Sequence, residues 1–569
     1  MHLKSFSIFI ILFLSVNLSA GILNSQKKLG ACAASDGTVA FALFAPGKTS
    51  VSVVGDFNSW NKTANPCSID GDGIWSCSIK MDSGEYRYKY LVDGTLYIGD
   101  PYAREVDWNS TGANSVLKVG GFGYSWGDSF YDAPAMNDLI IYETHIGDFS
   151  QSGTYRGMAA KLPYLKSLGI NAIELMPIME FPGDISWGYN PCFFFAPETA
   201  YGNPEDLKSL IDQSHQNGIA VILDVVFNHV HHESPLNQLY NYNKNPYMST
   251  DGNPWGFPDL NHWADCTKRF TKDVVEFWMK EYHIDGFRYD YTIGIGYDGY
   301  NGVSYFSWAA RQFKNNVYQI AEHLPQDPHL VQTTNINSEW HDTFHDQMKA
   351  NLREGTYSGS NYWGDLDKTQ KALNFAADGF SDNAQCINYT ESHDEERVIY
   401  EALTNSSIDY NLAVQKSRLA AIAIFTAAGI PMLYQGQEWG EDTRKTIDPN
   451  KIHWDKLNSD TGKSLCWMYA VMIKLRKDHP ALRYNNYELM RNYSDKKVTI
   501  FKRWDTNGDI VVVVLNFSND TQYVDIPFPN NGKWYERIYN FAADVSGNTL
   551  SNHDIPASSG KVFCLKKTW

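Results

Sequence analysis

The chain has 569 residues, and its 48 Lys and Arg against 65 Asp and Glu give a formal net charge of −17. This acidity excludes nucleic acid and anionic membranes as partners, because both require a basic face on the protein. With 43% hydrophobic and 14% aromatic residues the chain is not disordered by composition, and its length suits roughly two to four domains.

The N-terminus has the pattern of a signal peptide over residues 1–21. Lys4 precedes an apolar run at 6–16, and the small residue Ala20 follows this run. The run is too short to span a bilayer and no comparable stretch follows it, so we expect no transmembrane segment. These features predict a secreted or periplasmic protein, and they leave its oligomeric state open.

All eight cysteines follow the predicted cleavage point, and an even number in an exported protein permits disulfides. Cys67 and Cys77 form the best local pair, because Asp-Gly-Asp-Gly at 70–73 predicts a hairpin turn between them. No group of Cys and His residues has the spacing of a zinc site.

Residues 35–130 predict a small immunoglobulin-like β-sandwich. Tyr86, Tyr88 and Tyr90 alternate with basic residues, which is the period of two typical of a strand, and a turn at 92–94 follows.

From residue 138 to residue 480 the pattern changes to strands that alternate with helices. The clearest strands are expected at 140–142, 172–175, 220–226, 284–290, 317–321, 386–389 and 430–434. A helix is well marked between the second and third of these, because Asn203 can cap it, Pro204 suits its first turn and Gly218 can end it. Repeated β-α units of this kind predict a parallel (β/α)8 TIM barrel, with an open doubly wound sheet as the alternative.

Residues 485–569 are again rich in strand patterns, most clearly at 510–515 and 562–565. They predict a C-terminal β-sandwich. The expected protein is therefore multidomain, with a central barrel flanked by a β-sandwich at each end.

Polar residues of chemically active types follow several predicted barrel strands. They are Asp224, Asn228, His229, Arg288, Asp290, Glu322, His393 and Asp394. One such residue alone is usually a helix cap or a loop partner. Because parallel barrels place their active sites where the strands end, this many residues at successive strand ends predict an active site.

These segments resemble glycoside hydrolase family 13, the α-amylase family, over essentially the whole mature chain. The matching motifs lie, in the family's order, at 224–229, 257–261, 286–290, 321–322, 392–394 and 429–438. The sandwich at 35–130 resembles carbohydrate-binding module family 48, which accompanies branching, debranching and trehalose-releasing members.

The resemblance implies a retaining glycosidase, in which a carboxylate nucleophile and a protonated carboxyl lie about 5–5.5 Å apart. Asp290 would attack the anomeric carbon of the sugar, and Glu322 would protonate the leaving oxygen and then activate the acceptor. Asp394 would bind sugar hydroxyls as the ring distorts. Since Glu322 must hold a proton before the attack, we expect its surroundings to raise its pKa.

Further residues are expected to bind the substrate, namely Tyr189, Asp224, His229, Arg288 and His393. Arg288 is two residues before Asp290 on one strand, so both point to the same face and the guanidinium can keep Asp290 ionised. By resemblance the two histidines donate hydrogen bonds to the sugar, Asp224 supports the site and the Tyr189 ring stacks beneath the sugar.

One departure from the family pattern concerns a structural calcium ion. Asn228 and Asp259 match calcium-binding positions of the family, but the Lys-His pair that often follows the nucleophile is replaced by Tyr-Thr-Ile-Gly at 291–294. Calcium therefore stays open, and no cofactor is required for the chemistry itself.

The resemblance favours a secreted hydrolase that cleaves α-1,4 bonds of starch-like or glycogen-like α-glucans. The segment 172–182 resembles branching enzymes, which pass the same intermediate to a glucan hydroxyl. Export favours hydrolysis over branching, because storage glycogen made outside the cell serves little purpose. A trehalose-releasing hydrolase and a non-catalytic glucan-binding protein remain as further alternatives.

Overall fold

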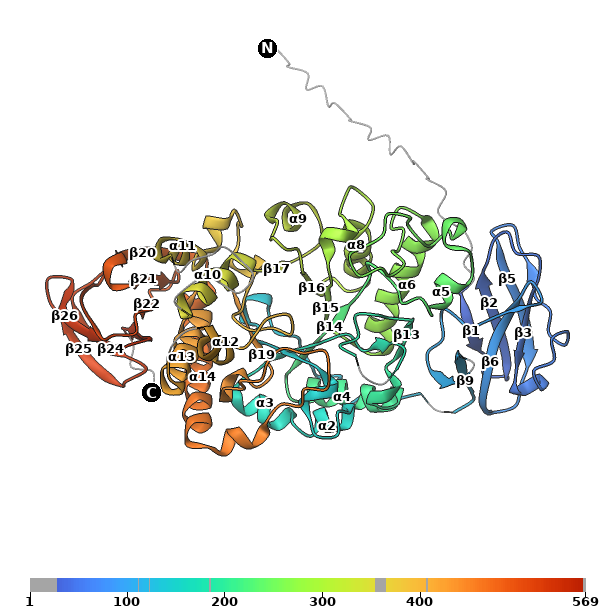
Figure 1. The fold of residues 1–569 in the computed structure, drawn as a ribbon, viewed down its shortest axis with the longest axis horizontal. Helices are drawn as coiled ribbons and strands as arrows, with labels where there is room; N and C mark the ends of the chain where they lie inside the picture. Colours follow the sequence, from blue (N-terminus) through green and yellow to red (C-terminus); the bar gives the residue numbers. More distant parts are fainter. Residues whose placement is uncertain are drawn as a thin grey trace, which may run out of the picture.

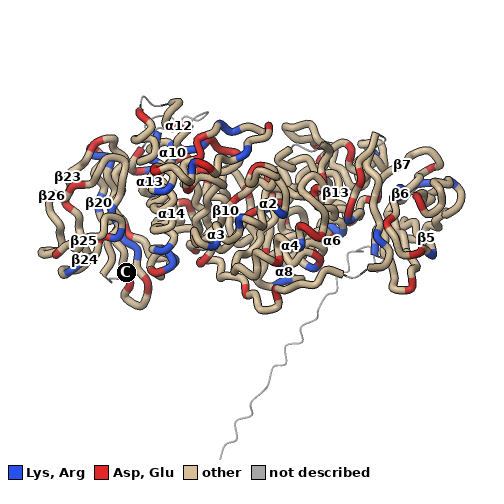
Figure 2. The backbone as a smooth tube through the Cα atoms, turned by 90° about the horizontal axis from the view of Figure 1, so that it is seen from below, with Lys and Arg blue, Asp and Glu red and all other residues tan. Residues whose placement is uncertain are grey.

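The protein consists of three parts arranged in a row, and the barrel lies between two β-rich parts (Figure 1). The computed structural model describes residues 28–110, 112–121, 123–183, 186–353, 365–405 and 408–565. The expected signal peptide lies outside the described residues. Acidic and basic residues both occur in all three parts (Figure 2).

The N-terminal part is a β-sandwich of two sheets, as predicted. One sheet has the order β1-β2-β5-β4, and the other has the order β3-β6-β9-β8 with β7 paired to β6. The bounds are β1 Gly30–Ala33, β2 Thr38–Phe44, β3 Val51–Gly55, β4 Ser68–Ile69, β5 Ile74–Lys80, β6 Gly84–Val92, β7 Leu96–Ile98, β8 Val106–Asn109 and β9 Gly112–Val119. On β6, Tyr88 and Tyr90 are buried between the sheets.

The turn at 70–73 joins β4 to β5, which pair in antiparallel fashion with Ile69 opposite Trp75. This hairpin brings Cys67 and Cys77 together, with 4.6 Å between their Cα atoms. The disulfide expected between these two cysteines stays a prediction.

The central part is a closed barrel of eight strands in the order β10-β11-β14-β15-β16-β17-β18-β19. Their bounds are β10 Ile141–Thr144, β11 Ala172–Leu175, β14 Ala220–Val225, β15 Gly286–Tyr289, β16 Tyr318–Ala321, β17 Ser338–Trp340, β18 Cys386–Asn388 and β19 Ile430–Tyr434. All pairs are parallel, and β19 closes onto β10 with Leu433 opposite Tyr142. The TIM barrel is confirmed and the open sheet is excluded.

The helices of this part lie around the barrel (Figure 1). They are α1 Ile146–Phe149, α2 Tyr155–Ala159, α3 Leu162–Leu168, α4 Pro204–Gln216, α5 Pro235–Gln238, α6 Asp265–Glu281, α7 Thr292–Ile295, α8 Val303–Phe313, α9 Pro328–Thr333, α10 Asp342–Leu352, α11 Leu366–Ala372, α12 Val398–Asn405, α13 Tyr410–Thr426 and α14 Asp460–Asp478. As predicted, Asn203 caps α4, where its side chain accepts from the Asp206 amide and Pro204 follows. No helix in the described ranges has both the length and the apolar character of a membrane span.

The C-terminal part has a sheet of order β20-β21-β22-β27-β24-β25 and a hairpin β23-β26. The bounds are β20 Asn486–Tyr493, β21 Val498–Trp504, β22 Ile510–Asn516, β23 Gln522–Pro527, β24 Gly532–Glu536, β25 Phe541–Val545, β26 Thr549–Ile555 and β27 Ser559–Cys564. It packs on α13, and the buried Arg503 donates to the Thr426 carbonyl at the end of that helix at 3.0 Å.

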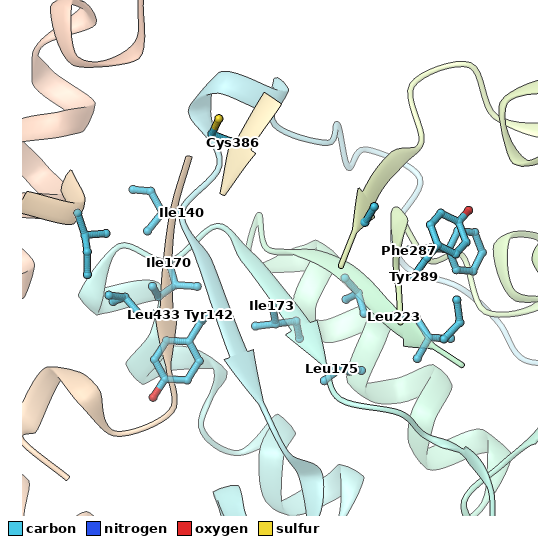
Figure 3. Close-up of a cluster of buried hydrophobic side chains, with 14 of the residues drawn as sticks. Ile140, Tyr142, Ile170, Ile173, Leu175, Leu223, Phe287, Tyr289, Cys386 and Leu433 are labelled. Carbon is cyan, nitrogen blue, oxygen red and sulfur yellow. The ribbon is translucent and has the colours of Figure 1, made fainter. Parts of the chain in front are cut away.

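Alternation along the barrel strands separates two apolar layers. One layer includes Tyr142, Leu223 and Phe287 and belongs to the large core that the strands share with the surrounding helices (Figure 3). The other includes Ile141 and Ile222 and fills the barrel itself. Because successive side chains of a strand point to opposite faces, this register determines which polar residues point inward at the strand ends.

A short buried hairpin, β12 Met179–Glu180 with β13 Phe193–Pro197, lies in the segment between β11 and α4. Tyr102 of the N-terminal part stacks on Phe195 of this hairpin at 4.5 Å, and its hydroxyl donates to Asp273 of α6 at 3.0 Å. The N-terminal sandwich is therefore packed directly against the barrel.

Candidate active site

The inward positions at the carboxyl ends of four neighbouring strands carry charged side chains. They are Glu143 on β10, Glu174 on β11, Asp224 on β14 and Arg288 on β15, and none is more than 1% exposed. Each shares the inward face with an apolar or small residue two positions earlier in the chain. The barrel thus changes from an apolar interior to a charged layer at the end where such barrels place their active sites.

Arg288 lies at the centre of this layer and pairs with three carboxylates. Its Nη1 is 2.9 Å from both oxygens of Asp224 and 3.0 Å from Asp290 Oδ1. Its Nη2 is 3.1 Å from Glu322 Oε2. A guanidinium stays charged when buried and is planar, so it holds the three carboxylates in fixed relative positions.

Trp340 on β17 supports the same guanidinium, with 4.5 Å between the Arg288 Cζ and the ring centroid. Strand β17 was not among the strands predicted from the sequence. Its three residues, Ser-Glu-Trp, are too few to show a strand pattern, and only the strand neighbours on both sides define it.

Burial, together with the neighbouring Glu322 carboxylate, raises the pKa of Asp290 well above its ordinary value. Burial raises the pKa of Asp224 to about 6, although Arg288 opposes this shift. Carboxyls this close titrate as a group and share protons. The raised pKa of Asp290 runs against the expected ionisation of this carboxyl by Arg288, although the guanidinium does oppose the shift. The assignment of a shared proton to Glu322, which leaves Asp290 ionised for the attack, stays a prediction.

The backbone after β15 holds Glu322 in place. The amide of Tyr291 donates to Glu322 Oε2 at 2.8 Å, and the Thr292 amide donates to the Glu322 carbonyl at 2.9 Å. Tyr291 has φ 45° and ψ 50°, a left-handed conformation that is unusual for a bulky side chain. Such strain at a residue between two candidate catalytic carboxylates is typical of functional sites.

Asp394 lies on the more open side of the site. Its side chain is 44% exposed, whereas those of Asp290 and Glu322 are 12% and 10% exposed. His393 lies between Asp394 and Glu143, with its Nε2 3.2 Å from Asp394 Oδ2 and its Nδ1 2.6 Å from Glu143 Oε1.

Burial alone would lower the pKa of His393, but the carboxylates of Asp394 and Glu143 outweigh it and raise this pKa well above the ordinary value. Burial likewise opposes the ionisation of Asp394, and the His393 cation outweighs it and lowers the pKa of that carboxyl. The pair is therefore charged, with Asp394 ionised at the open side.

Tyr189 and His229 line the same site. The Tyr189 hydroxyl donates to Asp224 Oδ2 at 2.6 Å, and its ring stacks on His393 with 4.9 Å between the centroids. His229 Nε2 is 2.9 Å from the Tyr189 carbonyl, and burial lowers the pKa of His229, so its ring is neutral. All eight predicted catalytic and substrate-binding residues thus converge on one site.

The two residues predicted for calcium lie at the edge of this site. The Asn228 amide nitrogen is 3.4 Å from Asp259 Oδ1, and the Asn253 amide also donates to that oxygen. The Oδ1 atom of Asp259 thus accepts hydrogen bonds from two amide side chains. Calcium at Asn228 and Asp259 stays a prediction, and no catalytic step requires it.

Glu143 and Glu174 were not among the predicted site residues. Glu143 pairs with His393, while both carboxyl oxygens of Glu174 are buried without a hydrogen-bond partner in the described part of the chain. The strand register could have revealed them. A Glu that points into the barrel must pair with a cation or carry a proton itself, because a buried unpaired carboxylate is costly.

A closed parallel barrel whose strand ends bring paired carboxylates onto one arginine defines a barrel enzyme suited to glycosidic bond chemistry. The comparisons with known proteins agree. Residues 126–251 and 240–464 match the family described as alpha amylase, catalytic domain. Residues 28–103 match carbohydrate-binding module 48, the isoamylase N-terminal domain, and residues 491–562 match the alpha amylase C-terminal all-beta domain.

Curated relatives include a malto-oligosyltrehalose trehalohydrolase of Saccharolobus solfataricus, 31% identical over 440 residues, or 71% of this chain and 74% of the relative. A 1,4-alpha-glucan branching enzyme GlgB of Rhodospirillum rubrum is 34% identical over 592 residues, or 92% of this chain and 76% of the relative. The solved structure of an Anoxybacillus pullulanase in complex with maltotetraose has a TM-score of 0.80 at 22% identity. The match covers 95% of this chain and 88% of the pullulanase chain, and it shows that the two proteins share a fold.

The chain belongs to the α-amylase family, glycoside hydrolase family 13. It is an enzyme of that family, with a family 48 carbohydrate-binding module before its barrel and the family's all-β domain after it.

Proposed function

We propose that the protein is a retaining α-glucan hydrolase that cleaves α-1,4 bonds of starch-like or glycogen-like chains. The observation that carries this proposal is the pairing of Asp290 and Glu322 with one guanidinium, that of Arg288. Two carboxylates bound to one planar group lie close together, as a retaining pair requires at about 5–5.5 Å.

In the first step, the Asp290 carboxylate bonds to the anomeric carbon while the bond from that carbon to the leaving oxygen breaks. Glu322 gives its proton to the leaving oxygen. In the second step, Glu322 takes a proton from water as the water oxygen bonds to the anomeric carbon and releases Asp290. Asp394, ionised and facing the open side, accepts hydrogen bonds from the sugar hydroxyls.

The substrate class is supported by the relatives. Those named above are a branching enzyme for 1,4-alpha-glucan and a trehalohydrolase for malto-oligosyltrehalose, and the pullulanase of similar fold binds maltotetraose. An α-glucan is neutral, so an acidic protein binds it without electrostatic cost.

The reaction is tested by following three products. The protein is incubated with amylose, and new reducing ends and new α-1,6 branch points are counted; malto-oligosyltrehalose is then offered, and released trehalose is measured. Hydrolysis predicts reducing ends without branches and little trehalose. Branch points with few reducing ends would instead identify a branching enzyme, and rapid trehalose release a trehalohydrolase.

The role of Glu322 is tested by Glu322→Gln, which keeps the shape of the side chain but cannot supply the proton. We expect kcat to fall by about 10²–10⁴-fold, the contribution that general acid–base catalysis usually makes. Glu488→Gln on the exposed edge of β20 is the matched control. Near-normal turnover by Glu322→Gln would reject the assignment.

We also propose that the protein is exported, on the basis of the basic, apolar and small-residue pattern of residues 1–21. N-terminal sequencing of the protein from the culture medium or the periplasm is expected to begin after this segment. An intact Met1 in a cytosolic fraction would contradict export.

A further inference from the structure

Glu143 is a buried carboxylate at the active site that the two steps of the proposed reaction do not use. Its side chain and that of His393 are each only 1% exposed. The backbone of Glu143 is fixed on both sides, because β10 pairs with β11 and with β19 in the closed barrel. A carboxylate buried this deeply is costly unless it is paired, so its partner indicates what it does.

Glu143 holds His393 at two points. Its Oε1 is 2.6 Å from the ring Nδ1, and its Oε2 accepts from the His393 backbone amide at 3.2 Å. The Tyr189 ring stacks on the imidazole with 4.9 Å between the centroids, and the Trp187 ring lies edge-on to it at 5.4 Å. Because Glu143 binds both the ring and the main chain, it fixes the position of the imidazole and also its rotation.

Both ring nitrogens of His393 face carboxylates. Nδ1 faces Glu143, and Nε2 is 3.2 Å from Asp394 Oδ2. An ionised carboxylate can only accept a hydrogen bond, so each ring nitrogen must carry a hydrogen, and a ring with both hydrogens is a cation. The direction of the pKa agrees, since burial alone would lower the pKa of His393 and the carboxylates of Asp394 and Glu143 outweigh it.

Asp394 is the residue through which this arrangement can affect the reaction. It is 44% exposed at the open side of the site, where it meets the sugar hydroxyls in the proposed mechanism. Although burial raises the pKa of Asp394, the His393 cation outweighs it and lowers this pKa, and the same ring orients one of the carboxylate oxygens. Glu143 therefore acts on Asp394 through His393.

Other charged groups near His393 do not replace Glu143. Asp224 on β14 is paired through both oxygens with Arg288 on β15, and burial raises the pKa of Glu174 on β11, so neither offers the ring a free negative charge. Removal of the Glu143 charge thus leaves the ring one hydrogen-bonded carboxylate among the described residues. A small cavity that His393 also lines adds the ionisable residues Asp148, Glu395, Arg397, Tyr434, Arg444 and Lys445.

We propose that Glu143 is a positioning residue for the glycosidic reaction, which holds the His393 ring charged and oriented and so presents Asp394 to the sugar as a fixed, ionised carboxylate. This inference rests on the proposed function, because that function gives Asp394 its role toward the sugar. Hydrogen bonds from such a carboxylate strengthen as the sugar distorts toward the transition state, so Glu143 should affect turnover more than substrate binding.

Glu143→Gln tests this inference, because it removes the charge and keeps the size of the side chain. On maltoheptaose at pH 7.5 we expect kcat/KM to fall about 30-fold, or about 2 kcal/mol, mainly through kcat. At pH 5 the loss should be below about threefold, because without Glu143 the pKa of His393 falls and the ring loses its proton between these two pH values. The ratio of wild type to variant cancels the pH dependence that the two proteins share.

Glu143→Asp keeps the charge, so its kcat/KM should stay within about fivefold of wild type at both pH values. Glu488→Gln, at an exposed position of β20, is the control that should change neither value. A loss in Glu143→Gln that is equal at pH 5 and pH 7.5, a loss that lies mainly in KM, or no loss at all would overturn the inference while the hydrolase activity stands.

Nitrogen NMR of the histidine rings tests the link from Glu143 to His393 without turnover. The His393 signals, assigned by their absence from His393→Gln, should show a cation in the wild type at pH 7.5 and a neutral ring in Glu143→Gln. The same charge in both proteins would overturn the inference.

If Glu143→Gln does not fold, the wild-type spectrum still decides, because a neutral ring overturns the inference and a cation supports it. If the wild type cleaves no glucan, the proposed function fails, and the spectra still show whether Glu143 sets the charge of His393.

Discussion

At the scale of single residues, the site contains few buried cations and many carboxyls. Arg288 and His393 pair with Asp224, Asp290, Glu322, Asp394 and Glu143. Glu174 stays outside these pairs, although it lies on the adjoining strand and is 1% exposed. Burial first, and then the Glu143 carboxylate, raise the pKa of Glu174 well above its ordinary value, and Arg288 only partly opposes this.

This residue allows a prediction on stability. Because folding raises the pKa of Glu174, the folded state binds this proton more tightly than the unfolded state does. Below the unfolded pKa of about 4.3 the carboxyl is protonated in both states and does not lower the free energy of unfolding. As the pH rises above this value, the carboxyl lowers the free energy of unfolding increasingly. Each unit by which folding raises this pKa corresponds to a loss of about 1.4 kcal/mol in the free energy of unfolding at high pH. Glu174→Gln should therefore raise Tm relative to wild type more at pH 8 than at pH 4.

Thermal unfolding of both proteins at the two pH values checks this prediction. Glu488→Gln removes an exposed carboxyl and should give the same small change at both. A difference for Glu174→Gln that does not grow with pH would mean that Glu174 is paired in the folded protein.

Sequence predicted the residues of the site better than it predicted their electrostatics. Asp290, Glu322 and Asp394 stand in motifs with characteristic neighbours, so the resemblance to the family located them. Glu174 and Tyr291 stand out only through burial and a left-handed backbone, which depend on the folded chain.

At the scale of elements, strands were predictable where their residues are apolar and β-branched, as in β14 and β22. The three-residue strand β17 was missed because it has no period to detect. Its position follows from closure of the barrel, since β16 and β18 both pair with it. The pairing with β16 and β18 thus defines the position of β17, which the local sequence pattern does not.

The contact of Tyr102 with the barrel yields a prediction for the N-terminal sandwich. Its ring stacks on Phe195 and lies edge-on to Phe270 at 5.7 Å. Tyr102→Ala should lower the free energy of unfolding by about 3 kcal/mol, the usual cost of removing a packed aromatic ring. Tyr97→Ala, at a 38% exposed position of β7, is the control that should change stability little.

Denaturant unfolding of the two variants checks this prediction. A loss below about 0.5 kcal/mol in Tyr102→Ala, the usual range for surface substitutions, would mean that the sandwich does not brace the barrel.

At the scale of the whole molecule, acidic and basic residues occur together in all three parts, and the net charge is −17 (Figure 2). A neutral polysaccharide is not attracted or repelled over long range by this charge. We therefore expect KM for amylose to change less than about twofold between about 0.05 and 0.5 M NaCl. Steady-state kinetics across this range test it, and a steep salt dependence would indicate a charged substrate.

If Asp290 and Glu322 carry out a double displacement, the configuration at the anomeric carbon is retained. The most direct test is proton NMR of the first products formed from maltoheptaose, recorded before mutarotation. Retention predicts that the new reducing ends appear as the α-anomer, the configuration of the bond that was cleaved. New reducing ends that appear first as the β-anomer would contradict it.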